Sequence, residues 1–174
     1  MRTWTTAPIR LAAATLAIAL AAPAAIARDT PSETPDLFGW VEWIELGDER
    51  IRKKGKLDSG ALTSSLDARE IEEFRRDGRR HVRFELHDRD SGEVTTLEKP
   101  IKRFVRIVRH SGNHQRRPVI EMDLCLGTTL HSVEFTLIDR SNFNYPVLLG
   151  RRALDGYALI DSGETFLRDP GCRG

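Results

Sequence analysis

Apolar and polar residues alternate along most of the chain from Phe38 onward, with the two-residue period that places successive side chains on opposite faces of a β-strand. In the run 39–46, Trp40 and Ile44 fall on one face, and the aromatic and β-branched content favours a strand. Further strands are predicted over residues 50–57, 81–86, 94–97, 101–109, 118–126, 133–138 and 147–149, with a short helix starting at 153–154 and a closing hairpin of 157–160 with 165–167. Many short strands with regular turns predict an all-β barrel or sandwich.

Residues 65–76 are the one stretch whose pattern favours a helix of several turns. Ser65 or Asp67 is suited to cap its N-terminus, and Ile71 and Phe74 form an apolar pair three residues apart. We therefore expect one helix here within an otherwise all-β chain.

The N-terminal segment has the pattern of a signal peptide. Arg2 and Arg10 form a positive region, an uncharged apolar run follows, and Ala25-Ile26-Ala27 supplies the small residues that signal peptidase requires. We expect a signal peptide over 1–27, a flexible leader over 28–37 and a single domain over 38–174. The interpretation predicts a periplasmic or secreted protein without stable membrane insertion after cleavage; an uncleaved N-terminal anchor is the alternative.

Charge and cysteine content add little about the partner. Removal of two arginines with the signal changes the balance from 27 against 26 to 25 against 26, a net charge of −1. Such a balance gives no reason to expect a nucleic acid. Cys125 and Cys172 could pair in an oxidising compartment, or Cys125 could be a buried free thiol; the sequence leaves both open.

Asp58 is the candidate catalytic residue. It ends a predicted strand and begins the run Asp58-Ser59-Gly60-Ala61. Aspartic proteases hold two such carboxyls about 3 Å apart, so the pair shares one proton and activates water. The triplet alone is weak evidence, because Asp161-Ser162-Gly163 repeats it and Asp-Ser-Gly is common in turns.

A second motif strengthens the interpretation. Val147-Leu148-Leu149-Gly150-Arg151 brings Gly150 92 positions after Asp58. An Asp-Ser-Gly-Ala run followed by hairpins and then Leu-Leu-Gly-Arg resembles the retropepsin-like aspartic proteases. The resemblance implies a small closed barrel of the acid-protease type, in which the Gly150 strand packs behind the catalytic loop and Arg151 begins a short helix.

The chain is also similar, over about 38–167, to the bacterial retropepsin-like family labelled ATP-dependent zinc proteases. The similarity rests on the motifs Gly39-Trp40-Val41-Glu42, Lys56 to Leu66, Phe74 to Gly78, Val82-Arg83-Phe84, Arg117 to Ile120, Asp139-Arg140 and Tyr145 to Arg151. It implies that Asp58 is catalytic and that its loop is supported by Ser59, Gly60, Ala61, Leu149, Gly150 and Arg151. Ser59 stands where the family usually has Thr, which keeps the hydroxyl that braces the opposite loop.

One such motif per chain implies a homodimer, because the dyad needs two carboxyls. The alternative is that Asp161 supplies the second one, but no apolar-apolar-Gly strand follows it before the chain ends. We therefore interpret Asp161 as the turn of the C-terminal hairpin.

Neither half of the zinc and ATP label finds support in the residues. The histidines are scattered; His110 and His114 straddle a turn, and no metal-binding helix motif or phosphate loop occurs. We expect no metal and no cofactor.

A flap should cover the cleft, and the turn Ser111-Gly112-Asn113 is the first candidate, with Asp90-Ser91-Gly92 second. Basic residues surround the first: Lys102, Arg103, Arg106, Arg109, Arg116 and Arg117. On alternating strands most should face solvent; if they line the cleft they favour an acidic peptide.

The sequence thus predicts an exported, homodimeric aspartic endopeptidase. The alternative is a retropepsin-fold peptide-binding or scaffold protein without proteolysis, working with the glutamate-ligase-type partner system that the family resemblance implies.

Overall fold

The computed structural model describes residues 34–108 and 114–172, which form twelve strands and one short helix. The strands are β1 (Asp36–Gly39), β2 (Val41–Leu46), β3 (Ile51–Asp58), β4 (Ser64–Asp67), β5 (Arg69–Arg76), β6 (Arg79–His87), β7 (Val94–Pro100), β8 (Arg103–Val108), β9 (His114–Leu126), β10 (Thr129–Ile138), β11 (Val147–Gly150) and β12 (Ala158–Asp161), and the helix is α1 (Arg151–Leu154). The predicted signal peptide and most of the leader lie outside these residues. No helix within 34–108 or 114–172 is long and apolar enough to cross a membrane.

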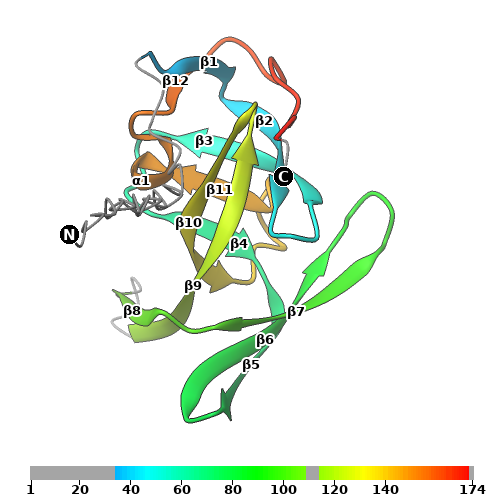
Figure 1. The fold of residues 1–174 in the computed structure, drawn as a ribbon, viewed down its shortest axis with the longest axis vertical. Coiled ribbons are helices and arrows are strands. Elements are labelled where there is room, and N and C mark those ends of the chain that lie inside the picture. The colour runs from blue at the N-terminus through cyan, green and yellow to red at the C-terminus, as the bar shows by residue number, and fades with distance from the viewer. Residues whose placement is uncertain (1–33, 109–113, 173–174) are drawn as a thin grey trace, which may run out of the picture.

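Six strands close into a barrel (Figure 1). Their order is β10-β4-β11-β3-β2-β9, and β9 pairs back onto β10. β8 extends the sheet from the outer edge of β9. The inward residues of these strands form one apolar core, which includes Ile44, Leu57, Phe135 and Leu149. The predicted all-β barrel is therefore confirmed. A short helix is also present; it begins at Arg151 and ends at Leu154.

The predicted helix over 65–76 is wrong. The segment divides into β4, which lies between β10 and β11, and β5, which pairs with β6. Asp67 caps no helix; its buried carboxylate accepts from the Arg140 N–H at 2.6 Å and from Arg89 at 3.0 Å. The apolar pair of Ile71 and Phe74 did not produce a helix, because β6 offers this segment a strand partner.

The predicted hairpin of 157–160 with 165–167 is also wrong. β12 instead pairs in parallel with β1, with Leu37 opposite Leu159. The next residues run along β2, where the Trp40 N–H donates to Glu164 and the Phe166 N–H donates to Val41. These pairings join the first and last strands that the structure describes, which are far apart in the sequence, and local turn signals do not reveal such contacts.

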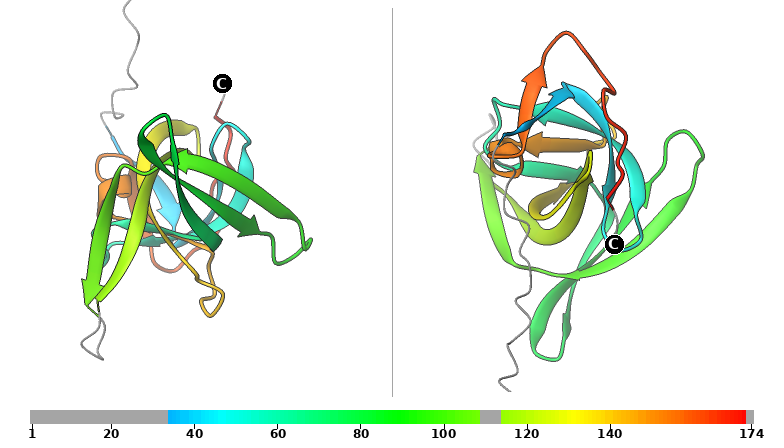
Figure 2. Two further views of the ribbon diagram at one scale, coloured as in Figure 1. Left: turned by 90° about the horizontal axis from the view of Figure 1, so that it is seen from below. Right: turned by 45° about the horizontal axis from the view of Figure 1, so that its top comes forward.

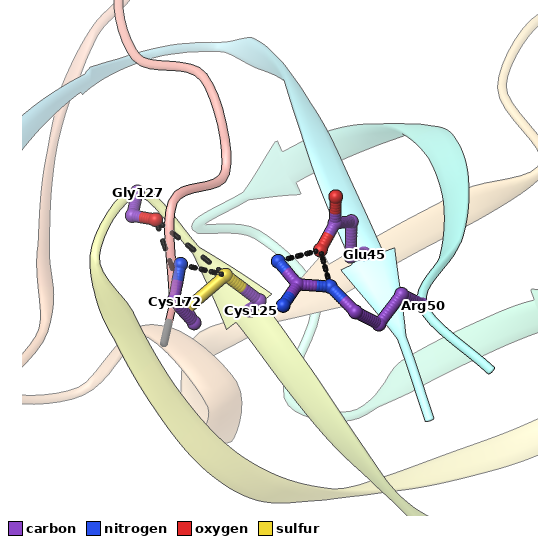
Figure 3. The surroundings of a disulfide bond; sticks show 5 residues. All are labelled: Glu45, Arg50, Cys125, Gly127 and Cys172. Atoms are coloured by element: carbon purple, nitrogen blue, oxygen red, sulfur yellow. Dashed lines mark hydrogen bonds and ion pairs between the residues drawn. A yellow bond between two sulfur atoms is a disulfide. The ribbon is translucent and has the colours of Figure 1, made fainter. Parts of the chain in front are cut away.

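Two features hold the C-terminal segment 164–172 against the barrel. The fully buried carboxylate of Glu42 accepts from the N–H groups of Gly39, Leu167 and Arg168 at 2.6, 3.0 and 3.2 Å. Near its end, Cys172 forms a disulfide with Cys125 in β9, beside the Gly127 carbonyl (Figure 3). Of the two alternatives left open for the cysteines, the paired one is present.

β5, β6 and β7 form a separate three-stranded sheet. β6 attaches it to the barrel, because Val82, Phe84 and Leu86 enter the core. The hairpin of β5 and β6 extends away from the barrel, at the bottom of Figure 1 and of the right panel of Figure 2.

Candidate active site

The strand β3 carries Asp58 to one end of the barrel. Its buried residues alternate, with Lys53, Gly55 and Leu57 inward, and its register is fixed on both sides by β2 and β11. Asp58 is the last residue of this central strand, so its position is set by strands rather than by a free loop. Its side chain is 24% exposed, which leaves the carboxylate accessible to water.

The loop after β3 folds back onto the Asp58 carboxylate. The Gly60 N–H donates to Oδ1 at 3.0 Å, and the Ala61 N–H donates to the Asp58 carbonyl at 3.2 Å. A Cβ on Gly60 would lie 3.1 Å from Oδ1, so a side chain there would press on the carboxylate. A glycine at this position lets the backbone approach the carboxylate without displacing it.

Lys56 contributes the nearest opposite charge. Its Nζ lies 3.3 Å from Oδ2 of Asp58, because residues two apart on a strand share a face. Partial burial raises the pKa of Asp58, but the Gly60 N–H and the Lys56 ammonium lower it more, and the net result is a lowered pKa. In the single chain Asp58 is therefore ionised at neutral pH.

β11 packs against residues 59–63, the loop that follows Asp58. Gly150 lies opposite Asp58 in the parallel register, and Leu149 lies opposite Leu57 in the core. A Cβ on Gly150 would lie 2.6 Å from the backbone carbon of Thr63, a distance that side chains do not tolerate. The Gly150 N–H also donates to the Ser64 hydroxyl at 3.1 Å. The packing expected of Gly150 from the sequence is present.

Arg151 ties the first residues of α1 to the same loop. Its N–H donates to the Ala61 carbonyl at 2.9 Å, and its Nη1 donates to the carbonyls of Ser59 and Gly60 at 2.9 and 3.2 Å. Sequence reasoning selected Arg151 but missed Lys56, Thr63 and Ser64. The position of Lys56, two residues before Asp58 on a strand, was a signal that could have identified it.

The Ser59 hydroxyl has no hydrogen-bond partner within the described residues of this chain, and Ser59 is exposed. Leu62, four residues after Asp58, is 50% exposed. Both border a hollow that is also lined by Arg152, Leu154, Ala158 and Ile160. An unpartnered hydroxyl and a hollow with both apolar and charged lining, which also includes Arg151 and Asp155, therefore lie directly beside the loop after Asp58.

Asp161 does not join Asp58. It ends β12, opposite Gly39, and its Oδ1 accepts from the Gly163 N–H at 2.8 Å in a local turn. Burial, Gly60, Lys56 and Ala61 are the main influences on the pKa of Asp58, and none is a second carboxylate. The part of the chain that the structure describes brings one carboxyl to this site.

The two flap candidates differ in what can be said of them. Ser111, Gly112 and Asn113 lie outside the described residues, but β8 and β9 lead into them as an antiparallel pair that ends with Val108 opposite His114. The turn at Asp90-Ser91-Gly92 joins β6 to β7. It is closed by Asp88, which accepts from Ser91 and pairs with the buried Lys53 at 2.9 Å.

No group of three or more His, Cys, Asp or Glu side chains is arranged to hold a metal ion within residues 34–108 and 114–172. His131 stacks on Tyr157 with ring centres 4.1 Å apart, and burial lowers its pKa. His110 lies outside the described residues, and His114 is the first residue of β9.

Comparisons with known proteins find a matching family model and a similar solved structure. A family model described as "Retropepsin-like aspartic endopeptidase RimB" (RimB-like) matches residues 37–171. A solved structure of a Legionella pneumophila protein of unknown function superposes with a TM-score of 0.67; it is 30% identical and covers 77% of this chain and 98% of its own.

Two similar relatives are each named "Probable alpha-L-glutamate ligase". The one from Shewanella pealeana is 36% identical over 140 residues, and the one from Desulfotalea psychrophila is 37% identical over 126. The matches cover 78% and 70% of this chain but 30% and 26% of the relatives. The chain thus spans less than a third of the relatives' length.

Proposed function

The chain belongs to the RimB-like family of retropepsin-like aspartic endopeptidases, and on that premise we propose that it hydrolyses peptide bonds with a dyad formed by the Asp58 residues of two copies. The observation that carries the proposal is the backbone packing of Gly150 on Thr63, with Gly150 directly opposite Asp58. This packing fixes a water-accessible carboxylate at the end of a barrel strand. Rigid placement is what a shared-proton dyad requires.

In the proposed reaction the two carboxyls hold one proton between them and titrate as a unit. The ionised one takes a proton from a water molecule, whose oxygen attacks the peptide carbonyl carbon. The protonated one donates to the carbonyl oxygen, and the tetrahedral intermediate then expels the amine with a proton returned to its nitrogen. Gly60 and Lys56 of each copy favour the ionised form of its Asp58, and the repulsion between the two carboxylates retains the one shared proton.

Dimerisation supplies what the single chain lacks. The exposed Ser59 hydroxyl can donate across the two-fold axis to the opposite loop, which is the bracing role expected of it. The exposed Leu62 of each copy can insert into the hollow of the other, which offers Leu154, Ala158 and Ile160 as apolar contacts, and such a reciprocal contact is isologous. The interface should therefore centre on residues 59–62.

An acidic peptide is the proposed substrate class, and the periplasm or extracellular space the proposed location. The relatives are named as probable ligases for glutamate, an acidic residue. The strands β8 and β9, which lead to the flap candidate, carry several basic residues that would attract an acidic peptide. Export rests on the N-terminal sequence pattern alone.

One observation favours a second candidate function, a peptide-binding or scaffold domain without turnover. Lys56 already forms an ion pair with Asp58 in the single chain. An ionised carboxylate whose charge is balanced in this way can serve in binding as well as in catalysis. The two functions differ in whether the protein cleaves peptides and whether that cleavage requires Asp58.

The test compares wild type with Asp58→Asn on a mixed peptide library that includes acidic sequences. Cleavage by wild type, with loss of at least about a thousandfold in Asp58→Asn at unchanged circular dichroism, is the expected result. Equal cleavage by both proteins rejects Asp58 as the catalytic residue. No cleavage by wild type at dimeric concentrations rejects the peptidase and leaves the binding domain.

A further inference from the structure

The three-stranded sheet of β5, β6 and β7 takes no part in the site around Asp58. β5 is an edge strand, and none of its eight residues is buried. We call residues 74–81, the outer part of the β5–β6 hairpin, the arm; it extends away from the barrel (Figures 1 and 2). A strand that buries so little adds little to the core, so its side chains are available for another role.

The arm concentrates positive charge in an unfavourable arrangement. Arg76 lies opposite Arg79, and Arg75 lies opposite Arg80, around a two-residue turn at 77–78. Like charges directly opposite on antiparallel strands repel. Arg76 pairs with Glu98, but within the described residues Arg75, Arg79 and Arg80 pair with no carboxylate.

A hollow between the arm and β8 collects these charges. It is lined by Arg79, Arg80, Lys102 and Arg103 around a floor of Ile101 and Phe104, and no acidic residue lines it. Lys102 pairs with Glu121 and Glu134, and Arg103 pairs with Glu134, whereas Arg79 and Arg80 pair with no carboxylate within the described residues. The hollow therefore presents two guanidinium groups that lack a counter-charge, next to an apolar floor.

The surroundings of Phe104 indicate which anion fits. The Arg116 guanidinium lies 3.3 Å from the centre of the ring, and Arg80 lies 5.6 Å from it. The ring face is thus occupied by cations and is not free to stack on a nucleic-acid base. The arm's turn carries Asp77 and no apolar side chain, which disfavours insertion into an anionic membrane. Carboxylates on short aliphatic stems match guanidinium groups above an apolar floor.

We propose that this hollow is a binding site, outside the catalytic centre, for acidic side chains of a polypeptide. Arg79 and Arg80 bind the carboxylates, and Ile101 contacts their methylene groups. β8 contributes its first two residues, Arg103 and Phe104, to the wall of this hollow. The identification of that polypeptide as substrate rests on the proposed function; the binding does not.

Binding is measured by fluorescence anisotropy with labelled hexaglutamate and hexaglutamine, in the Asp58→Asn protein so that no cleavage intervenes. The test variant adds Arg79→Gln and Arg80→Gln. The control adds Arg52→Gln and Lys54→Gln, which removes the same charge from β3. A third variant with Arg79→Lys and Arg80→Lys keeps the charge, and thermal melting verifies that each protein is folded.

Hexaglutamate should bind more tightly than hexaglutamine, and the Gln variant of the hollow should weaken it about fivefold or more at low salt, with the control unchanged. The Lys variant should retain most of the affinity. Equal affinity in the Gln variant, an equal loss in the control, or tighter binding of hexathymidylate or phosphatidylglycerol vesicles overturns the proposal. Because cleavage is not measured, these results are independent of whether Asp58 is catalytic.

Discussion

At the scale of single residues, the environment of Asp58 is determined by two neighbours with different roles. The Gly60 N–H orients the carboxylate, and Lys56 supplies charge through a half-exposed ammonium 3.3 Å away. Both lower the pKa of Asp58 against the opposing effect of burial. The acid limb of a pH profile should therefore depend on Lys56.

Lys56→Met tests this dependence. Loss of the ammonium removes stabilisation of the ionised carboxylate, so the pKa of Asp58 should rise and the acid limb of kcat/KM should move to higher pH. The sign follows because a carboxyl with a higher pKa loses its ionised form at a higher pH. Lys54→Met, whose ammonium pairs with Asp90, is the matched control and should leave the limb in place. A Lys56→Met profile that superposes on wild type contradicts this account.

At the scale of elements, the barrel and the catalytic loop meet at one point of backbone contact. β11 approaches the loop so closely that a Cβ on Gly150 would lie 2.6 Å from a backbone atom of Thr63. Backbone cannot rotate aside as a flexible side chain can. The position of Asp58 therefore depends on Gly150, because only a residue without a side chain lets β11 pack this closely on the loop.

Gly150→Ala should accordingly destabilise the protein by about 1–3 kcal/mol or more and abolish activity through displacement of the loop. Urea unfolding measures the first effect and peptide cleavage the second. Gly171→Ala is the control, because a Cβ at Gly171 would meet no neighbouring atom within 4 Å. Wild-type stability in Gly150→Ala would show that the loop does not pack as described.

The elements also show what the sequence could and could not predict. Alternation identified most barrel strands, and the two motifs placed Asp58 and Gly150 together. The helix over 65–76 was wrong because strand partners for β4 are far along the chain. The predicted final hairpin was wrong because β12 pairs with β1, which is more than a hundred residues earlier in the sequence, and turn residues cannot predict such a distant contact. Lys56 was missed because lysines on a strand usually face solvent, and the sequence does not show that this ammonium lies against Asp58.

At the scale of the whole molecule, the C-terminal segment closes the structure by two independent attachments. The Glu42 carboxylate accepts hydrogen bonds from the backbone N–H groups of Leu167 and Arg168. The Cys125–Cys172 disulfide holds the segment near its end. An oxidising compartment, as export would provide, keeps the second attachment formed.

Replacing both cysteines by alanine should lower the free energy of unfolding by about 2–4 kcal/mol. In hydrogen exchange, the Gly171 amide, which donates to Gly127, should lose protection, whereas Phe166 and Leu167 should keep theirs. Reduced wild type should match the variant. Equal loss of protection along the whole segment would indicate that the disulfide alone holds it.

The central claim is that each chain carries half of an active site, and mixing subunits tests it most directly. Wild type and Asp58→Asn are mixed in varying proportion, allowed to exchange subunits, and assayed for peptide cleavage at constant total protein. A dyad across the dimer predicts that activity follows the square of the wild-type fraction, about one quarter at an equal mixture. Activity proportional to the wild-type fraction, about one half at that point, would show that one chain is sufficient and would contradict the account.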